Sequence, residues 1–304
     1  MRSPVPIKEY LQGSKKVVEQ ITVGDLTLTW LNGGVIHMDG GAIFGVVPKS
    51  LWSKKYRYNE KNQVELCTDP ILIQVEGKNI LLETGIGNNK FSDKQIRNYG
   101  ITSESKLSSN LNELGLSTSD IDYVLMTHMH FDHACGIAKW EGDDLVPTFE
   151  NATIIVNEKE WEELKKPNIR SRNTYWEENW SPILDKVQTF NGMIEVIPGI
   201  EIHHTGGHSD GHSIVLIKRN GECFIHMADL MPTHAHSNPL WVSAYDDYPM
   251  ISIAAKQKWL DKGLDEGSWF IFYHDNKYRA LKWNKEGEII SEVLRKQTIE
   301  IKET

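Results

Sequence analysis

The sequence predicts an α/β protein in which two sheets are covered by helices. Short runs of β-branched and apolar residues alternate along the chain with segments of helical periodicity, and mixed elements of this kind stack in layers. The 304 residues contain no repeat of solenoid length and no Pro/Gly/Ser-rich linker. We therefore expect one domain over residues 1–304, with residues 1–20 as an N-terminal extension.

The first half of the chain supplies strands and helices in alternation. β-branched runs bounded by turn residues predict strands at 26–34, 71–85, 121–127 and 152–157, the second being a hairpin that turns at Glu76-Gly77-Lys78. Helical spacing predicts helices at 92–100, 106–116 and 158–166, with a further helix-opening pattern at 117–120. These elements give one sheet and its covering helices.

The second half begins with an irregular segment and continues mainly as strands. Residues 165–182 contain three aromatic residues without periodicity, which is typical of a lid or of a surface excursion. Apolar runs then predict strands at 200–205, 213–218, 223–229 and 269–275. These strands supply the second sheet.

Composition excludes several classes of protein. The chain is 39% hydrophobic and 25% charged, as globular proteins are, and no apolar run approaches the ~18 residues of a membrane-spanning helix. The net charge of −9 argues against a nucleic-acid surface. With no secretory pattern at the N-terminus and three scattered cysteines, we expect a cytoplasmic protein with reduced thiols. A homodimer is compatible with these features.

The stretch THMHFDHACG at residues 127–136 concentrates potential metal ligands. His128 and His130 are two positions apart at the end of a predicted strand, so that both side chains project to the same side. Asp132 and His133 follow at the turn into a helix. Neutral imidazoles and a carboxylate are the ligands expected for zinc or a similar divalent ion. Because four adjacent donors fit poorly around one ion, two neighbouring ions are expected.

Three further donors stand directly after predicted strands. His208 lies in the glycine-rich turn TGGHSDGHS, Asp229 ends the run at 223–229, and His274 follows WFIFY. Each alone is as well explained as a polar residue at a strand end, but together with the first cluster they predict one site at a sheet edge. The remaining histidines are assigned to the core or surface (His203, His204, His226), to a supporting or turn position (His212), or to no role (His37).

This order of motifs resembles the metallo-β-lactamase superfamily over about residues 20–280. The resemblance implies a four-layer αβ/βα sandwich of two mixed sheets flanked by helices, with a dinuclear site at one edge. It implies two divalent ions per chain, expected to be zinc, with one held by His128, His130 and His208. The other would be held by Asp132, His133 and His274, with Asp229 bridging both. Glu83-Thr84-Gly85 stands where the family usually has Asp-Thr-Gly.

Residues 28–52 and 227–249 are similar to the YtnP-type quorum-quenching N-acyl-homoserine lactonases. The implied activity is opening of a small-molecule lactone ring by a metal-bound hydroxide, with Asp132 passing a proton to the leaving alkoxide. Well-known acyl-homoserine lactonases carry a tyrosine three residues after the bridging aspartate, where this chain has Pro232. His236, or a tyrosine on another loop, is the expected replacement.

Alternatives to the lactonase remain open from the sequence. The same metal ligands would serve a hydrolase of organophosphates, thioesters or other esters, whereas redox relatives usually replace the second histidine with glutamate, and His130 is present. A non-catalytic metal-binding module is a further alternative. Five aromatic residues are expected either to wall an acyl-chain cleft or to be ordinary core residues: Trp30, Phe44, Trp52, Phe131 and Trp241.

Overall fold

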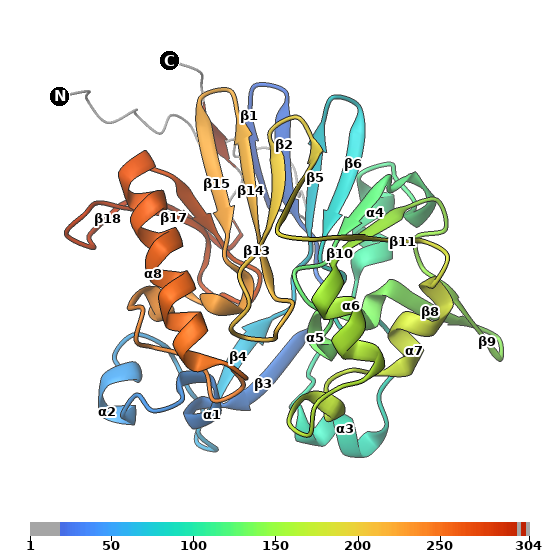
Figure 1. Ribbon diagram of the computed structural model, residues 1–304, viewed down its shortest axis with the longest axis horizontal. Coiled ribbons are helices and arrows are strands. Elements are labelled where there is room, and N and C mark those ends of the chain that lie inside the picture. The colour runs from blue at the N-terminus through green and yellow to red at the C-terminus, as the bar shows by residue number, and fades with distance from the viewer. Residues whose placement is uncertain (1–18, 297–298, 302–304) are drawn as a thin grey trace.

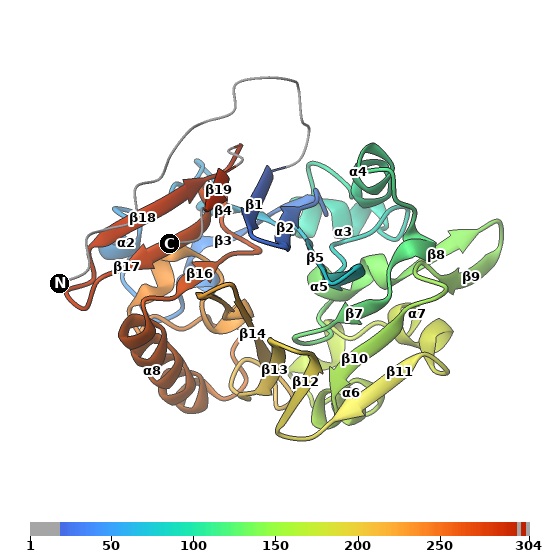
Figure 2. The same ribbon diagram turned by 90° about the horizontal axis from the view of Figure 1, so that it is seen from above.

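The computed structural model describes residues 19–296 and 299–301, and it has the predicted α/β architecture. Two mixed sheets face each other, and helices lie on their outer sides (Figures 1 and 2). Residues 1–18 of the predicted N-terminal extension lie outside the described residues, whereas Glu19 and Gln20 already belong to the first strand.

The first sheet contains eight strands in the order β11-β10-β7-β6-β5-β2-β1-β19. The strands are β1 (Glu19–Val23), β2 (Leu26–Trp30), β5 (Ile71–Val75), β6 (Lys78–Leu82), β7 (Tyr123–Leu125), β10 (Thr153–Asn157), β11 (Val187–Phe190) and β19 (Ile299–Ile301). The side of this sheet away from the second sheet is covered by α4 (Leu107–Glu113) and α6 (Glu158–Lys165) (Figure 2). Leu111 and Trp161 anchor these helices in the apolar layer beneath them.

The second sheet contains seven strands in chain order. They are β12 (Met193–Ile197), β13 (Ile200–His204), β14 (Ser213–Arg219), β15 (Glu222–His226), β16 (Trp269–Ile271), β17 (Tyr278–Trp283) and β18 (Ile289–Leu294). The helix α8 (Pro249–Glu266) covers its outer face (Figure 1). Trp259 and Leu260 of α8 pack there against strand residues such as Ile214 and Phe270.

The main core lies between the two sheets. One face of each strand contributes to it, because alternate side chains of a strand point to opposite faces. Leu28 and Ile73 from the first sheet and Val215 and Ile217 from the second are 0–1% exposed. Burial of each such side chain contributes about 1.5–3 kcal/mol, so the sheet pair forms a rigid base for the loops at its edge.

Smaller elements cluster at the ends of the sheets. A two-stranded ribbon pairs β3 (Val35–Asp39) with β4 (Gln63–Cys67), and a hairpin pairs β8 (Ala138–Glu141) with β9 (Asp144–Pro147). The short helices are α1 (Gly40–Phe44), α2 (Lys49–Trp52), α3 (Asp93–Asn98), α5 (Phe131–Ala134) and α7 (Glu177–Trp180). In the described part of the chain, no helix has the length and apolarity needed to cross a membrane.

Most predicted elements are present, and one large element was missed. The hairpin turns where predicted, whereas residues 117–120 form only a 3₁₀ turn (Thr118–Asp120) before β7. The helix α8 was not predicted because Ser252, Lys256 and Gly263 occupy three of its five buried positions, which removes the apolar periodicity. The buried ammonium group of Lys256 is satisfied by hydrogen bonds that it donates to the carbonyl oxygens of Trp241 (2.5 Å) and His236 (3.4 Å).

Candidate metal centre

The potential ligands lie in loops that follow strands of both sheets. The strand β7 ends at Leu125, so that His128 and His130 lie in the following loop, and Asp132 and His133 lie in the first turn of α5. His208 is in the turn between β13 and β14. Asp229 and His274 each come three residues after a strand, β15 and β16 respectively. These loops meet at one edge of the sandwich.

The seven residues assemble into two neighbouring groups. His128, His130 and His208 offer ligand atoms within 4.8 Å of one another, and so do Asp132, His133 and His274. In the first group, Nδ1 of His130 lies 2.9 Å from Nε2 of His208. In the second, Nε2 of His133 lies 3.1 Å from Nε2 of His274. Three imidazoles in the first group, and two imidazoles with a carboxylate in the second, are donor sets that could each hold one divalent ion.

Asp229 lies between the two groups and directs one oxygen to each. Its Oδ1 is 3.3 Å from Nε2 of both His133 and His274. Its Oδ2 is 3.3 Å from Nε2 of His208 and 3.9 Å from Nε2 of His128. This is the arrangement that a bridging carboxylate requires.

The outer nitrogens of the histidines are held by fixed partners. Nδ1 of His208 lies 2.9 Å from Oδ1 of Asp246, and Nδ1 of His274 lies 2.7 Å from the carbonyl oxygen of Cys67. Nδ1 of His128 lies 3.0 Å from the hydroxyl of Thr127. Such partners orient an imidazole so that its other nitrogen faces the ion. No pattern in the sequence indicates a role for Asp246, which is 38 residues from His208.

Glu83 supports this arrangement from the strand side. Its Oε1 accepts hydrogen bonds from the backbone N–H (3.2 Å) and from the hydroxyl of Thr127, and its Oε2 lies 3.6 Å from Nδ1 of His133. It also falls within 4.8 Å of donors of His128 and His133. Oε2 of Glu83 and Nδ1 of His133 thus face each other without a hydrogen bond, and neither atom has another hydrogen-bond partner among the described residues.

The chemistry of the donor set fits divalent metal ions. Nε2 of His128 and Oδ1 of Asp229 are buried and have no hydrogen-bond partner among the described residues, which is costly for polar atoms unless another group satisfies them. Burial, together with nearby histidines, keeps the pKa of both His128 and His130 well below its usual value, whereas Asp229 and other nearby carboxylates together outweigh burial and raise the pKa of His133 and His208. Neutral imidazole is the form that binds a metal.

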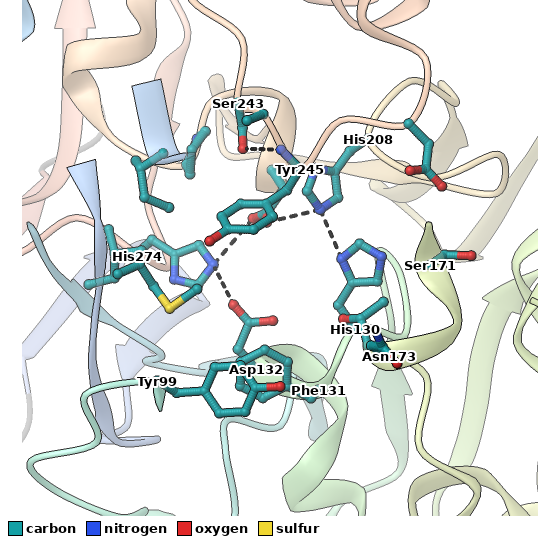
Figure 3. A pocket seen from close by; sticks show the side chains of 18 of the residues that line it. Tyr99, His130, Phe131, Asp132, Ser171, Asn173, His208, Ser243, Tyr245 and His274 are labelled. Atoms are coloured by element: carbon teal, nitrogen blue, oxygen red, sulfur yellow. Dashed lines mark hydrogen bonds and ion pairs between the residues drawn. The ribbon is translucent and has the colours of Figure 1, made fainter. Parts of the chain in front are cut away.

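A pocket of about 430 Å³ opens directly above these donors. Figure 3 shows His130, Asp132, His208 and His274 around it, with Tyr99 and Phe131 on one side. Of the five aromatic residues expected to form an acyl-chain cleft, Phe131 lines the pocket. Trp30 belongs to the core between the sheets, and Phe44, Trp52 and Trp241 do not line the pocket but pack in or against the cluster that lies behind its wall at α1 and α2. Met38, Ile43 and Leu66 provide the other apolar walls.

The segment 165–182 forms one side of this pocket. Arg170, Ser171, Asn173 and Thr174 line it. The Arg170 guanidinium donates to Oδ1 of Asp247 (2.9 Å) and to the carbonyl oxygen of Ala244 (2.9 Å), and Trp176 of this segment stacks on Phe131 with a centroid distance of 5.4 Å. The segment is therefore a wall of the site and more than a surface excursion, one of the two alternatives that the sequence left open.

His236 lies apart from the pocket, whereas Tyr245 lies in it. The His236 ring is buried and stacked on Phe44, with Nδ1 2.8 Å from the hydroxyl of Thr233 and Nε2 3.1 Å from the carbonyl oxygen of Ile43. It does not line the pocket. Tyr245 extends across the pocket near His208 and His274 (Figure 3). Burial and the nearby Asp132 carboxylate raise the pKa of Tyr245 to about 12, so its hydroxyl keeps its proton at neutral pH.

Glu160 joins the elements that carry the ligands. This fully buried carboxylate accepts hydrogen bonds from the backbone N–H of Met129 (2.7 Å), the hydroxyl of Tyr175 (2.9 Å) and the hydroxyl of Ser209 (2.6 Å). It therefore connects the loop of His128 and His130, the segment 165–182 and the loop of His208. Gly211 allows the close approach, because a Cβ there would lie 2.0 Å from the backbone nitrogen of Glu160.

Replacement of Glu160 should destabilise the protein in a pH-dependent way. In Glu160→Ala, three buried donors lose their acceptor, which should lower the free energy of unfolding by about 3 kcal/mol or more, whereas Glu160→Gln keeps two of the three acceptor contacts. Burial raises the pKa of Glu160 from 4.5 to about 7, so the folded state binds the extra proton between these values. The Glu160 contribution to stability therefore falls as pH rises through this window.

Thermal unfolding of wild type and Glu160→Gln across this pH range tests that expectation. The stability of the glutamine variant relative to wild type should increase with pH, because glutamine does not titrate. A difference that stays constant from about pH 4.5 to about pH 7 would contradict the assignment.

Comparisons with known proteins agree with this geometry. A sequence profile described as "Metallo-beta-lactamase superfamily" matches residues 68–274. An N-acyl homoserine lactonase from Bacillus cereus is 29% identical over 157 residues, which are 48% of this chain and 56% of that protein. The chain thus spans about half the length of the curated relatives that it matches.

Solved structures share the fold over most of the chain. A probable metal-dependent hydrolase from Staphylococcus aureus is 49% identical with a TM-score of 0.87, covering 91% of this chain and 99% of the other. AidC, a dizinc quorum-quenching lactonase in complex with a product, is 20% identical with a TM-score of 0.75, covering 92% and 99%. At 20% identity this second likeness shows the fold alone.

Proposed function

The chain belongs to the metallo-β-lactamase superfamily, and from this premise we propose that it is a lactonase with two divalent metal ions, expected to be zinc. Its substrates would be N-acyl-homoserine lactones, whose hydrolysis quenches quorum sensing. The observation that carries the proposal is the pair of three-donor groups with Asp229 between them, at the base of a pocket with apolar walls. The Bacillus lactonases support the substrate class.

In this proposal the residues of the chain have distinct tasks. His128, His130 and His208 would hold one ion, Asp132, His133 and His274 the other, and Asp229 both. When bound, the ions would supply Lewis acidity and an activated water for ester hydrolysis. The Asp132 carboxylate, which lines the pocket, would carry a proton to the ring oxygen as the lactone opens. Tyr99, Phe131, Met38, Ile43 and Leu66 would contact the acyl chain.

Well-known acyl-homoserine lactonases have a tyrosine at the position of Pro232, and Tyr245 would perform its role in this chain. Its protonated hydroxyl is suited to donate a hydrogen bond to the lactone carbonyl oxygen as negative charge develops there. Tyr245→Phe should therefore lower kcat/KM by about 10²-fold, the usual cost of losing one such donor. Tyr99→Phe is the matched control, because Tyr99 lines the same pocket and stacks on Phe131 at 4.2 Å. If kcat/KM fell in Tyr99→Phe and not in Tyr245→Phe, Tyr99 and not Tyr245 would be the donor to the lactone carbonyl oxygen.

A substrate panel together with elemental analysis tests the proposed activity. The purified chain should contain two divalent ions and should hydrolyse acyl-homoserine lactones faster than a phosphotriester such as paraoxon or a glutathione thioester. Removal of the ions with a chelator should abolish the activity, and zinc should restore it. At most one ion after reconstitution would contradict the dinuclear site, and preference for the phosphotriester or thioester would contradict the lactonase assignment.

A further inference from the structure

A second cavity lies beside the ribbon β3–β4, separate from the metal pocket. It has a volume of about 810 Å³, and its walls come from residues 53–59, the ribbon, residues 276–277 and residues 294–296. Along the ribbon, His37 and Glu65 line this cavity, whereas Met38 and Leu66 line the metal pocket, as the alternation of side chains in strands requires. None of the seven proposed metal ligands lines it.

Positive charge is concentrated in this second cavity, which we call the basic cavity. Its lining has one carboxylate, Glu65. Six cationic residues line it: Lys54, Lys55, Arg57, Lys277, Arg295 and Lys296. The chain as a whole has a net charge of −9, so the basic cavity has the opposite sign to the rest of the protein.

Most of these cations have no carboxylate partner in the described part of the chain. Within residues 19–296 and 299–301, only Arg295 among the six lies within 4.0 Å of a carboxylate oxygen; its guanidinium is 3.9 Å from Glu65 and 3.8 Å from Asp69. Glu65 is also 3.7 Å from Nε2 of His37. The ammonium groups of Lys55 and Lys277 instead lie over the rings of Trp241 (5.0 Å) and Tyr278 (4.5 Å), which orients them but leaves their charge uncompensated.

The walls of the basic cavity are tied together by buried groups. The hydroxyl of Tyr56 donates to the carbonyl oxygen of Glu65 (3.0 Å) and accepts from the backbone N–H of Asn276 (3.1 Å). The backbone N–H of Arg295 donates to the carbonyl oxygen of Lys277 (2.8 Å). Because these contacts connect wall segments, the backbone positions that carry the cations are fixed around the cavity before any ligand enters, which lowers the entropic cost of binding.

His234 adds a further polar group. Its Nδ1 lies 2.6 Å from Oδ2 of the buried Asp275, which also accepts from the backbone N–H of His234 (2.7 Å). Its Nε2 has no partner in the described part of the chain, and the side chain is 16% exposed at the cavity lining. Several ammonium and guanidinium groups form a donor set suited to phosphate oxygens, and only the doubly protonated His234 ring would add an Nε2–H donor to it.

We propose that the basic cavity binds a small molecule carrying two phosphate groups, such as a nucleoside diphosphate or a sugar bisphosphate. A single negative charge would leave most of the cations uncompensated, whereas two phosphates would pair with several of them. The volume falls in the range of small-molecule sites, about 300–1,000 Å³. A long polyanion is disfavoured because it would extend from the cavity over an acidic protein surface.

Isothermal titration calorimetry of the metal-loaded full chain with ADP and with fructose 1,6-bisphosphate tests this proposal. The matched variants are Arg57→Glu/Lys277→Glu in the cavity and Lys94→Glu/Lys258→Glu outside its lining, which make the same charge change at exposed positions. Binding should weaken about tenfold or more only in the cavity variant, and it should weaken with added salt. Melting curves establish that each variant is folded, and Arg57→Ala serves if the double variant is not.

The outcomes distinguish the basic cavity from other sites. Binding of both probes identifies the phosphates as the recognised groups, and binding of ADP alone identifies a nucleotide; either result, if lost in the cavity variant, supports the proposal. Undiminished binding in that variant places the ligand elsewhere, including at the metal ions, and overturns the proposal. The proposal is also overturned if neither probe binds to the wild-type chain, whether or not a DNA duplex does.

Discussion

Asp229→Ala should lose both metal ions and reduce lactone hydrolysis by about 10³-fold or more. The Asp229 carboxylate lies 3.3 Å from ring nitrogens of His133, His208 and His274, so its removal takes a ligand from both groups at once. The Lewis acidity of such ions is worth several kcal/mol in the transition state, and each 1.4 kcal/mol or so corresponds to a factor of about ten in rate.

Elemental analysis beside the kinetic assay checks this expectation. Asp210→Ala is the matched control, because Asp210 belongs to the loop of His208 but its half-exposed carboxylate points to Lys159, at 3.5 Å, its one ion-pair partner among the described residues. That variant should retain its ions and its rate. An Asp229→Ala protein that retained two ions and the wild-type rate would show that Asp229 does not bridge the site.

Asp132→Asn should lower kcat by about 10²–10⁴-fold while KM changes little. These are the usual contributions of general acid–base catalysis. Asparagine keeps the shape and one oxygen donor of Asp132 but cannot carry a proton. The Asp132 carboxylate lines the pocket 3.6 Å from Nε2 of His274, so it can both contact an ion and reach the opening ring.

A series of esters separates the two roles of Asp132. If the carboxylate carries a proton to the alkoxide, the loss of rate should shrink as the leaving group becomes a weaker base, because such alkoxides need no proton. Metal content must be measured in the same samples, since a lost ion would imitate the effect. An asparagine variant with both ions and wild-type lactone turnover would leave Asp132 as a ligand only.

Local sequence predicted the strands nearest the site but missed others, among them the ribbon β3–β4, β11, β12, β17 and β18. The hairpin β5–β6 and the helix α6 form where β-branched runs and helical spacing place them. The strand β16 covers only Trp269–Ile271 of the predicted 269–275, because the chain leaves the sheet to bring His274 to its edge. The helix α8 buries only two large apolar residues, Trp259 and Leu260, beside Ser252, Lys256 and Gly263, so its sequence shows no periodic apolar pattern.

The support of the metal centre depends on contacts between distant residues. Asp246 holds His208, and Glu160 joins two ligand loops to the segment 165–182. Acidic residues of this kind are common on surfaces, and nothing in their sequence neighbourhood indicates that they are buried. Tyr245 lies within the stretch 227–249 that resembles lactonases, but only its position across the pocket favours it over His236.

The sequence by itself determined the fold class, the family resemblance and the cluster of donors from His128 to His133, because a strand followed by a tight turn fixes neighbouring side chains locally. Only the tertiary structure decided which outer partners hold the ligands, which aromatic residues form the pocket, and that six cations meet in the basic cavity. These features join loops separated by tens to hundreds of residues. Their contacts arise from the packing of the two sheets and the helices around them, which no local pattern encodes.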